Sequence, residues 1–215
     1  MIYIYNLEIS NPSFSVNEAN LLSILSNKRQ QKVLSYYFEI DRLLSLYSAL
    51  VVRMCLSKIT GIPYNKLDFS YTDLGKPYLN NSNIFFNLSH TKNGILLAVS
   101  TDSDIGADIE NVQIIPPYNI INDIFHPAEI EFIHKTPTSL QTRFYEIWTK
   151  KEAYLKYLGT GLTSNMKDFN SLNLSGYIYT YNFNSYVNSV YCKNSSPISK
   201  YTILQEDIFQ YYSVI

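Results

Sequence analysis

Cysteine is scarce in this chain of 215 residues, which contains only Cys55 and Cys192. The two lie far apart in the sequence, and Cys55 falls in an apolar stretch of helical spacing, where a thiol packs as a small hydrophobic side chain. Two isolated cysteines provide neither the clustered spacing of a zinc site nor the density of a disulfide framework. The sequence therefore predicts neither kind of structure.

The chain also lacks an excess of charge and a long apolar run. Seventeen Lys and Arg residues against eighteen Asp and Glu residues leave a formal net charge of -1, so nothing attracts the whole chain to nucleic acid or to an anionic membrane. The longest apolar run, Ile95–Val99, is too short to span a bilayer. The start, MIYIYNLEIS, alternates like a strand and lacks the features of a signal peptide. We expect a cytoplasmic protein that binds neither nucleic acid nor membranes.

The first half of the chain shows helical and then strand-like patterns. From Asn17 to Lys58, apolar residues recur at helical spacing, which predicts two consecutive helices with Gly61 as a C-terminal stop. Short strand-like runs follow, with turn signals at DLGKP and LNNSN between them. These runs are LDFSYT, IFFNLS, GILLAVS and IGADIENV.

A second cycle of elements follows. Pro127 suits the first turn of a helix in HPAEIEFIHK, and a longer helix is predicted from about Ser139 to Leu158, ending at Gly159. Alternating Tyr, Ile and Val residues predict strands from Ser175 to Ile215.

This repeated order of helices and then strands predicts an α+β fold of two similar halves. Residues 1–103 form the predicted N-terminal half and residues 104–215 the C-terminal half. In each half, helices pack on a small, mostly antiparallel sheet.

Two carboxylates, Asp108 and Glu110, lie two positions apart in IGADIENV. Side chains two apart on a strand point to the same face, so both acids emerge together. On the exposed face of an edge strand they would be ordinary surface residues. The pair alone does not decide between a surface and a functional role.

Two other motifs also have structural interpretations when taken singly. WTKKEAYLKYLGTGL places Trp148, Glu152 and Lys156 at successive i+4 positions. An exposed Glu-to-Lys pair of this kind stabilises a helix by only about 0.3–0.5 kcal/mol, and Trp148 is expected mainly to pack. FNLSHTKNG places Ser89 and His90 at a strand end, where neighbours point to opposite faces and cannot easily share a proton.

In this order, the three motifs resemble those of the 4'-phosphopantetheinyl transferases, in particular the monomeric type that activates surfactin synthetase. That family carries a Gly-x-Asp-x-Glu strand, a Trp-[Ser/Thr]-x-Lys-Glu-[Ala/Ser]-x-x-Lys helix and a Gly-x-Gly-Leu end. Every defining position is filled here, by Gly106, Asp108, Glu110, Trp148, Thr149, Lys151, Glu152, Ala153, Lys156, Gly159, Gly161 and Leu162. The resemblance extends to LGKP and covers most of residues 1–165. It implies the pseudo-twofold fold of the family.

The resemblance also implies an activity: transfer of the 4'-phosphopantetheine arm of coenzyme A to a serine of an apo acyl or peptidyl carrier protein, with release of 3',5'-ADP. It implies a single Mg²⁺, or Mn²⁺ in its place, bound by Asp108, Glu110 and Glu152. Carboxylate oxygens suit such a cation, which would remove the repulsion between the acids. Lys156 would bind the pyrophosphate and stabilise or protonate the departing ADP. Glu152, directly or through water, is the candidate base for the serine proton.

Coenzyme A contacts follow from the same resemblance. Besides Lys156, the residues at family positions that approach its phosphates are Lys28, Lys76, Ser89 and His90. Two family cations are missing: Gln31 replaces a basic residue, with Lys32 beside it, and Leu44 replaces an arginine, with Arg42 two residues earlier. Positions two apart on a helix face differently. Recognition of the 3'-phosphate is therefore where this chain departs from the family.

Two other functions remain open from the sequence. One is a non-catalytic module that binds coenzyme A or carrier proteins, which the intact Glu152 and Lys156 disfavour. The other is an unrelated Mg²⁺-dependent phosphoesterase, which the lack of a second cluster of acids or histidines disfavours. The length of the chain fits the monomeric branch of the family, in which one chain supplies both halves.

Overall fold

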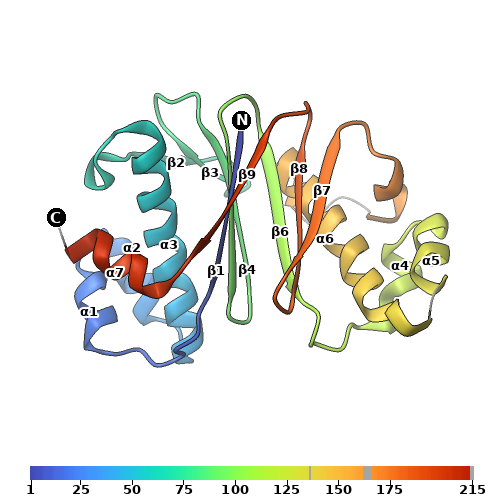
Figure 1. The fold of residues 1–215 in the computed structure, drawn as a ribbon, viewed down its shortest axis with the longest axis horizontal. Helices are drawn as coiled ribbons and strands as arrows, with labels where there is room; N and C mark the ends of the chain where they lie inside the picture. Colours follow the sequence, from blue (N-terminus) through green and yellow to red (C-terminus); the bar gives the residue numbers. More distant parts are fainter. Residues whose placement is uncertain (136, 162–165, 214–215) are drawn as a thin grey trace.

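Two β-sheets lie side by side at the centre of the molecule, with helices on both outer sides (Figure 1). The computed structural model describes residues 1–135, 137–161 and 166–213. The helices are α1 (Val16–Leu22), α2 (Asn27–Leu34), α3 (Glu39–Thr60), α4 (Ile121–Ile124), α5 (Pro127–His134), α6 (Leu140–Leu158) and α7 (Gln205–Ser213). The strands are β1 (Ile2–Glu8), β2 (Phe69–Tyr71), β3 (Pro77–Leu79), β4 (Phe85–Thr91), β5 (Gly94–Ser100), β6 (Ile105–Asn111), β7 (Tyr177–Phe183), β8 (Tyr186–Cys192) and β9 (Ile198–Ile203). The α+β prediction is confirmed.

The sheets differ in their pairing. The first has the order β4-β5-β1-β9, in which β1 is antiparallel to β5 and parallel to β9. The second has the order β6-β8-β7 and is antiparallel throughout. A small hairpin of β2 and β3 lies beside the first sheet. Helices α1–α3 and α7 lie beyond the first sheet and α4–α6 beyond the second (Figure 1).

The N-terminal helical region contains three helices where the sequence pattern predicted two. The helix α1 begins at a capping box, in which Ser15 accepts from the backbone N–H of Asn17 and Glu18 accepts from that of Ser15. Ser26 then adopts an extended conformation, which separates α1 from α2. The predicted stop of α3 at Gly61 is confirmed, because this residue adopts the left-handed conformation with φ of 73°.

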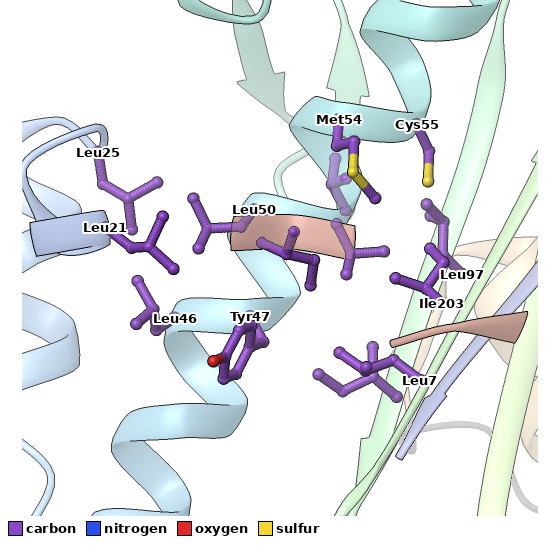
Figure 2. Packing of buried hydrophobic residues seen from close by; sticks show 14 of the residues in the cluster. Leu7, Leu21, Leu25, Leu46, Tyr47, Leu50, Met54, Cys55, Leu97 and Ile203 are labelled. Atoms are coloured by element: carbon purple, nitrogen blue, oxygen red, sulfur yellow. The ribbon is translucent and has the colours of Figure 1, made fainter. Parts of the chain in front are cut away.

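The long helix α3 forms the centre of the larger core. By length and composition it is apolar enough to cross a membrane, but 67% of its most apolar window is buried inside the protein, as in the core helix of a globular protein. Figure 2 shows side chains of α3 between α1 on one side and the first sheet on the other. The labelled α3 residues are Leu46, Tyr47, Leu50, Met54 and Cys55, and they pack with Leu7, Leu21, Leu25, Leu97 and Ile203.

The C-terminal segment differs from its prediction in two ways. The strands β7, β8 and β9 form as expected, but α7 follows them as a helix, because Ile208 and Tyr212 are spaced to face α3. The Tyr212 hydroxyl donates to the carbonyl oxygen of Leu50 at 2.8 Å. The strand β9 pairs with β1. Residues 198–213 therefore lie with the first half, whereas the sequence division placed them in the second.

A shared apolar layer joins the two sheets and sets which way β6 faces. Ile105, Ala107 and Ile109 of β6 are buried in this layer, against residues of β1, β5 and β8. Since side chains alternate along a strand, the intervening Asp108 and Glu110 lie on the opposite face. That face packs against α6.

Candidate functional site

Close packing of α6 against β6 begins at Gly106. A Cβ atom on this glycine would lie 1.9 Å from the carbonyl oxygen of Ala153 and 2.5 Å from the backbone nitrogen of Tyr157, both in α6. Only glycine permits that approach. Glu152 and Lys156 lie one turn apart on this part of α6. The contact therefore places them next to the acids of β6.

Asp108, Lys156 and Ser89 form a closed set of hydrogen bonds between the two halves. The Lys156 Nζ donates to Asp108 Oδ1 at 2.5 Å and to Ser89 Oγ at 2.8 Å. The Ser89 hydroxyl in turn donates to Asp108 Oδ1 at 2.8 Å. Asp108 is almost fully buried, while Lys156 keeps 30% of its side chain exposed.

The two glutamates beside Asp108 lie where burial and a neighbouring negative charge disfavour their ionised forms. Burial and the charge of Asp108 raise the pKa of Glu110 to about 7, against the opposing effect of a hydrogen bond from Thr91. Burial and Asp108 likewise raise the pKa of Glu152 to about 7, with Lys156 opposing. Asp108 Oδ2 and Glu152 Oε1 are buried without a hydrogen-bond partner among the described residues. Buried carboxylates with an unpaired oxygen atom or a raised pKa commonly mark functional sites.

Strand β4 contacts β6 through its side chains, which sequence reasoning only partly anticipated. Asn87 Oδ1 accepts from the Ala107 backbone N–H at 3.0 Å, and the Thr91 hydroxyl donates to Glu110 Oε2 at 3.0 Å. With Ser89 between them, these residues lie two apart along β4. The alternation N-x-S-x-T in the sequence was the available signal for this arrangement.

Two of the predicted coenzyme A contacts, His90 and Lys156, lie close enough to interact electrostatically. Part of the His90 side chain is exposed. Burial of the remainder, together with Lys156 and Arg29, lowers its pKa, with Asp41 opposing and Lys32 adding to the decrease. The neutral form of the His90 ring is therefore favoured over the charged form in this state. Sequence reasoning missed Arg29, whose position directly after Lys28 was the only signal available.

Lys28 and Lys76 make no contact with His90 in the described part of the chain. Lys28 is exposed. Lys76 donates to Asp104 Oδ1 and to the carbonyl oxygen of Tyr157, each at 3.2 Å. Lys76 thus links the β2–β3 hairpin to the C-terminal end of α6.

The substitution at Leu44 is explained by its position in the core. Leu44 is 5% exposed and belongs to the cluster around α3. Arg42 lies on another face of α3 and donates from Nε to the carbonyl oxygen of Tyr36 at 2.9 Å. An arginine placed at residue 44 would bury a charge. Arg29, whose Nη2 donates to the carbonyl oxygen of Ser45 at 2.7 Å, is the arginine whose charge acts on His90.

Two motif residues on α6 serve other contacts. Lys151 is fully buried and donates to Glu129 Oε2 at 2.9 Å and to the carbonyl oxygens of Met166 and Phe169 at 2.5 and 2.7 Å. It therefore faces away from Asp108. Trp148 stacks on Phe144, with ring centroids 6.0 Å apart, and its indole lies close enough to Glu110 to lower the pKa of that carboxyl. Its role is thus packing plus a contact with the acid.

The Gly-x-Gly-Leu end is described only in part. Gly159 and Gly161 both adopt the left-handed conformation, with φ of 70° and 65°, and Gly159 ends α6 as predicted. Leu162 lies outside the described residues.

The geometry and charge of the acids decide whether they fit a metal ion. Within the described ranges, no three Asp, Glu, His or Cys side chains are already arranged as a metal-binding group. Nevertheless, the two unpartnered oxygen atoms and the raised pKa values of Glu110 and Glu152 show a negative charge that is only partly compensated. A divalent cation would supply that compensation, so the donor set fits the group.

Fold and site together define a class of protein. It is an α+β protein of two halves, with a buried acidic cluster and an accessible lysine where they meet, suited to binding a phosphorylated ligand. The family model described as the 4'-phosphopantetheinyl transferase superfamily matches residues 104–201. A second model, described as 4'-phosphopantetheinyl transferase, N-terminal, matches residues 11–102. The chain belongs to the 4'-phosphopantetheinyl transferase superfamily.

Individual relatives agree with this assignment. The chain is 31% identical over 150 residues to the 4'-phosphopantetheinyl transferase gsp of Aneurinibacillus migulanus, covering 69% of this chain and 62% of that protein. It is 27% identical over 169 residues to a 4'-phosphopantetheinyl transferase of Bacillus subtilis, covering 77% and 74%. It is 33% identical over 163 residues to the L-aminoadipate-semialdehyde dehydrogenase-phosphopantetheinyl transferase of Schizosaccharomyces pombe, covering 67% and 62%. The chain thus aligns with only part of each relative.

Proposed function

We propose that this protein transfers the 4'-phosphopantetheine arm of coenzyme A to a serine of an apo acyl or peptidyl carrier protein. The observation that carries the proposal is the cluster of Asp108, Glu110 and Glu152 beside Lys156, buried where the halves meet and left with unpartnered oxygens. Family membership supports the same reaction. Both halves contribute to the site from one chain, which supports action as a monomer.

Asp108, Glu110 and Glu152 are the residues that would hold a Mg²⁺ ion, with Mn²⁺ as a substitute. When bound, the ion would neutralise the pyrophosphate of coenzyme A. The protein's own contribution is to fix where the anionic ligand and the acids lie, because phosphoryl transfer depends mainly on positioning and on charge stabilisation.

Glu152 and Lys156 are the proposed catalytic residues. The serine oxygen attacks the pyrophosphate phosphorus nearer the pantetheine arm, and the bond from that phosphorus to 3',5'-ADP breaks. Glu152, directly or through a water molecule, is the proposed acceptor of the serine proton. Lys156 binds the pyrophosphate and stabilises the departing ADP, and its partial exposure leaves it free to do so.

The first half supplies most of the proposed contacts to the nucleotide. His90 and Arg29 would face the 3'-phosphate, and Arg29 would take the role of the family arginine that Leu44 replaces. Arg29 Nε is buried and has no hydrogen-bond partner among the described residues, so this donor is available. An incoming phosphate would raise the pKa of His90 and favour its charged form. Lys28, Lys76 and Ser89 remain proposed contacts.

The test is the intact mass of an apo carrier protein after incubation with the protein, coenzyme A and Mg²⁺. The expected result is a gain of one phosphopantetheine arm and formation of 3',5'-ADP. Both should vanish in excess chelator and in Asp108→Ala. Binding of coenzyme A without a gain of mass would indicate a binding module instead. Release of phosphate or 3',5'-ADP without a carrier would indicate a phosphoesterase.

A further inference from the structure

The side chains of β4 meet the acids of β6 in a regular register. Ser89 and Thr91 lie two residues apart on β4, and Asp108 and Glu110 lie two residues apart on β6. Each hydroxyl donates to one carboxylate, Ser89 to Asp108 at 2.8 Å and Thr91 to Glu110 at 3.0 Å. Asn87 fixes this register, because its side chain accepts from the backbone of Ala107. Side chains of β4, the edge strand of the first sheet, therefore hold the carboxylates of β6 in the second sheet.

The two hydroxyls differ in what else they contact. Ser89 also accepts from Lys156, so its loss would disturb the lysine and the acid together. Thr91 contacts the cluster only through Glu110 in the described part of the chain. Thr91 also lies at the end of β4, directly before the turn to β5. Substitution at residue 91 therefore isolates the effect on a single carboxylate.

We propose that Thr91 is a positioning residue, which holds the Glu110 carboxylate in the orientation that binds the divalent cation. This inference rests on the proposed function, since that function assigns Glu110 as a ligand. A hydroxyl that donates to one oxygen of a carboxylate limits its rotation and directs the other oxygen. Hydrogen-bond partners of metal ligands typically change metal affinity by about 10- to 100-fold when they are removed.

The experiment measures Mn²⁺ binding directly, because the electron paramagnetic resonance signal reports free Mn²⁺. The Mn²⁺ that coenzyme A binds without protein is measured separately and subtracted. The variant is Thr91→Val, which keeps a branched side chain in the strand and removes the hydroxyl. Thr91→Ser, which restores a hydroxyl, is the rescue variant. Thr202→Val, on the exposed part of β9, controls for the same substitution elsewhere. The transfer assay and thermal melting are run on every variant.

The expected result is Mn²⁺ binding weakened by about 10- to 100-fold in Thr91→Val, with nearly normal transfer at saturating metal. Thr91→Ser and Thr202→Val should bind Mn²⁺ like the wild type. In a Glu110→Gln background, Thr91→Val should produce no further change in Mn²⁺ affinity. Unchanged Mn²⁺ affinity in Thr91→Val would overturn the inference, and so would a Thr91→Ser variant as weak as Thr91→Val.

The inference and the proposed function can fail separately. Wild-type protein that transfers the arm normally but binds no Mn²⁺ would overturn the role of Thr91 and leave the transferase function standing. Wild-type protein that binds Mn²⁺ in a Thr91-dependent manner but modifies no carrier would overturn the function alone. A lower melting temperature with unchanged Mn²⁺ affinity would make Thr91 merely structural, which contradicts the proposal.

Discussion

Two lysine–carboxylate contacts lie on different faces of α6, and they differ in how completely their atoms are hydrogen-bonded. Both Glu129 oxygens have partners, from the Ser171 backbone at 2.6 Å, the His126 backbone at 2.8 Å and Lys151 at 2.9 Å. Lys151 also donates to two backbone carbonyl oxygens. No atom of this pair is left available to a ligand.

The contact between Lys156 and Asp108 is incomplete by comparison. Asp108 Oδ2 has no partner among the described residues, and neither does Glu152 Oε1 nearby. Lys156 is partly exposed, whereas Lys151 is fully buried. An unpaired buried polar atom is unfavourable, and two such carboxylate oxygens beside a partly exposed lysine favour a ligand-binding role for this cluster. The comparison separates a structural ion pair from a functional one on a single helix.

The largest effect on activity is expected from Glu152→Gln. Loss of the base should lower the transfer rate by about 100- to 10,000-fold. The melting temperature should stay the same or rise, because the amide removes a charge that burial and Asp108 disfavour. Steady-state transfer and thermal melting check both outcomes, and a stable variant with normal turnover would remove Glu152 from the catalytic residues.

The largest effect on stability is expected from Lys151→Met. Removing one partner of a buried ion pair typically lowers the free energy of unfolding by about 3–5 kcal/mol. Adding Glu129→Gln should recover part of that loss, since the uncompensated charge disappears. Urea denaturation of the single and double variants measures both changes. If Lys151→Met lost transfer while unfolding like the wild type, the lysine would have to be placed in the active site.

Arg29→Met is expected to change substrate preference. Loss of a charge-assisted contact of about 1.5–3 kcal/mol should reduce the preference for coenzyme A over dephospho-coenzyme A by roughly one to two powers of ten. Arg42→Met is the matched control, because Arg42 is held by Tyr36. The ratio of kcat/KM for the two donors is the measurement. Collapse of the preference in Arg42→Met alone would show that the wrong arginine had been assigned.

The smallest effect is expected from Trp148→Phe. The smaller ring should lower the free energy of unfolding by about 1–2 kcal/mol through lost packing against Phe144. Loss of the indole contact to Glu110 should weaken Mn²⁺ binding less than Thr91→Val does. Denaturation and Mn²⁺ titration of the two variants test this order. A variant that unfolds like the wild type yet has lost nearly all turnover would make Trp148 part of the catalytic machinery.

Sequence patterns predicted the elements that carry the site. Alternation in IGADIENV placed Asp108 and Glu110 on one face of β6, and the i+4 spacing placed Glu152 and Lys156 on one face of α6. The patterns could not show which strand lies opposite β6, because Thr91 reaches Glu110 only through the packing of segments distant in the sequence. For the same reason, β9 was not predicted to pair with β1, nor α7 to complete the core around α3.

The contrast between Asp108 as a functional carboxylate and Glu129 as a structural one is tested most directly by comparing Asp108→Asn with Glu129→Gln. Each variant is given an apo carrier protein, coenzyme A and Mg²⁺ at low temperature, and the carrier is weighed while a melting curve is recorded. Asp108→Asn should melt like the wild type and leave the carrier unmodified, whereas Glu129→Gln should melt at a lower temperature and still add the arm. Normal modification by Asp108→Asn, or a folded Glu129→Gln protein without activity, would contradict the account.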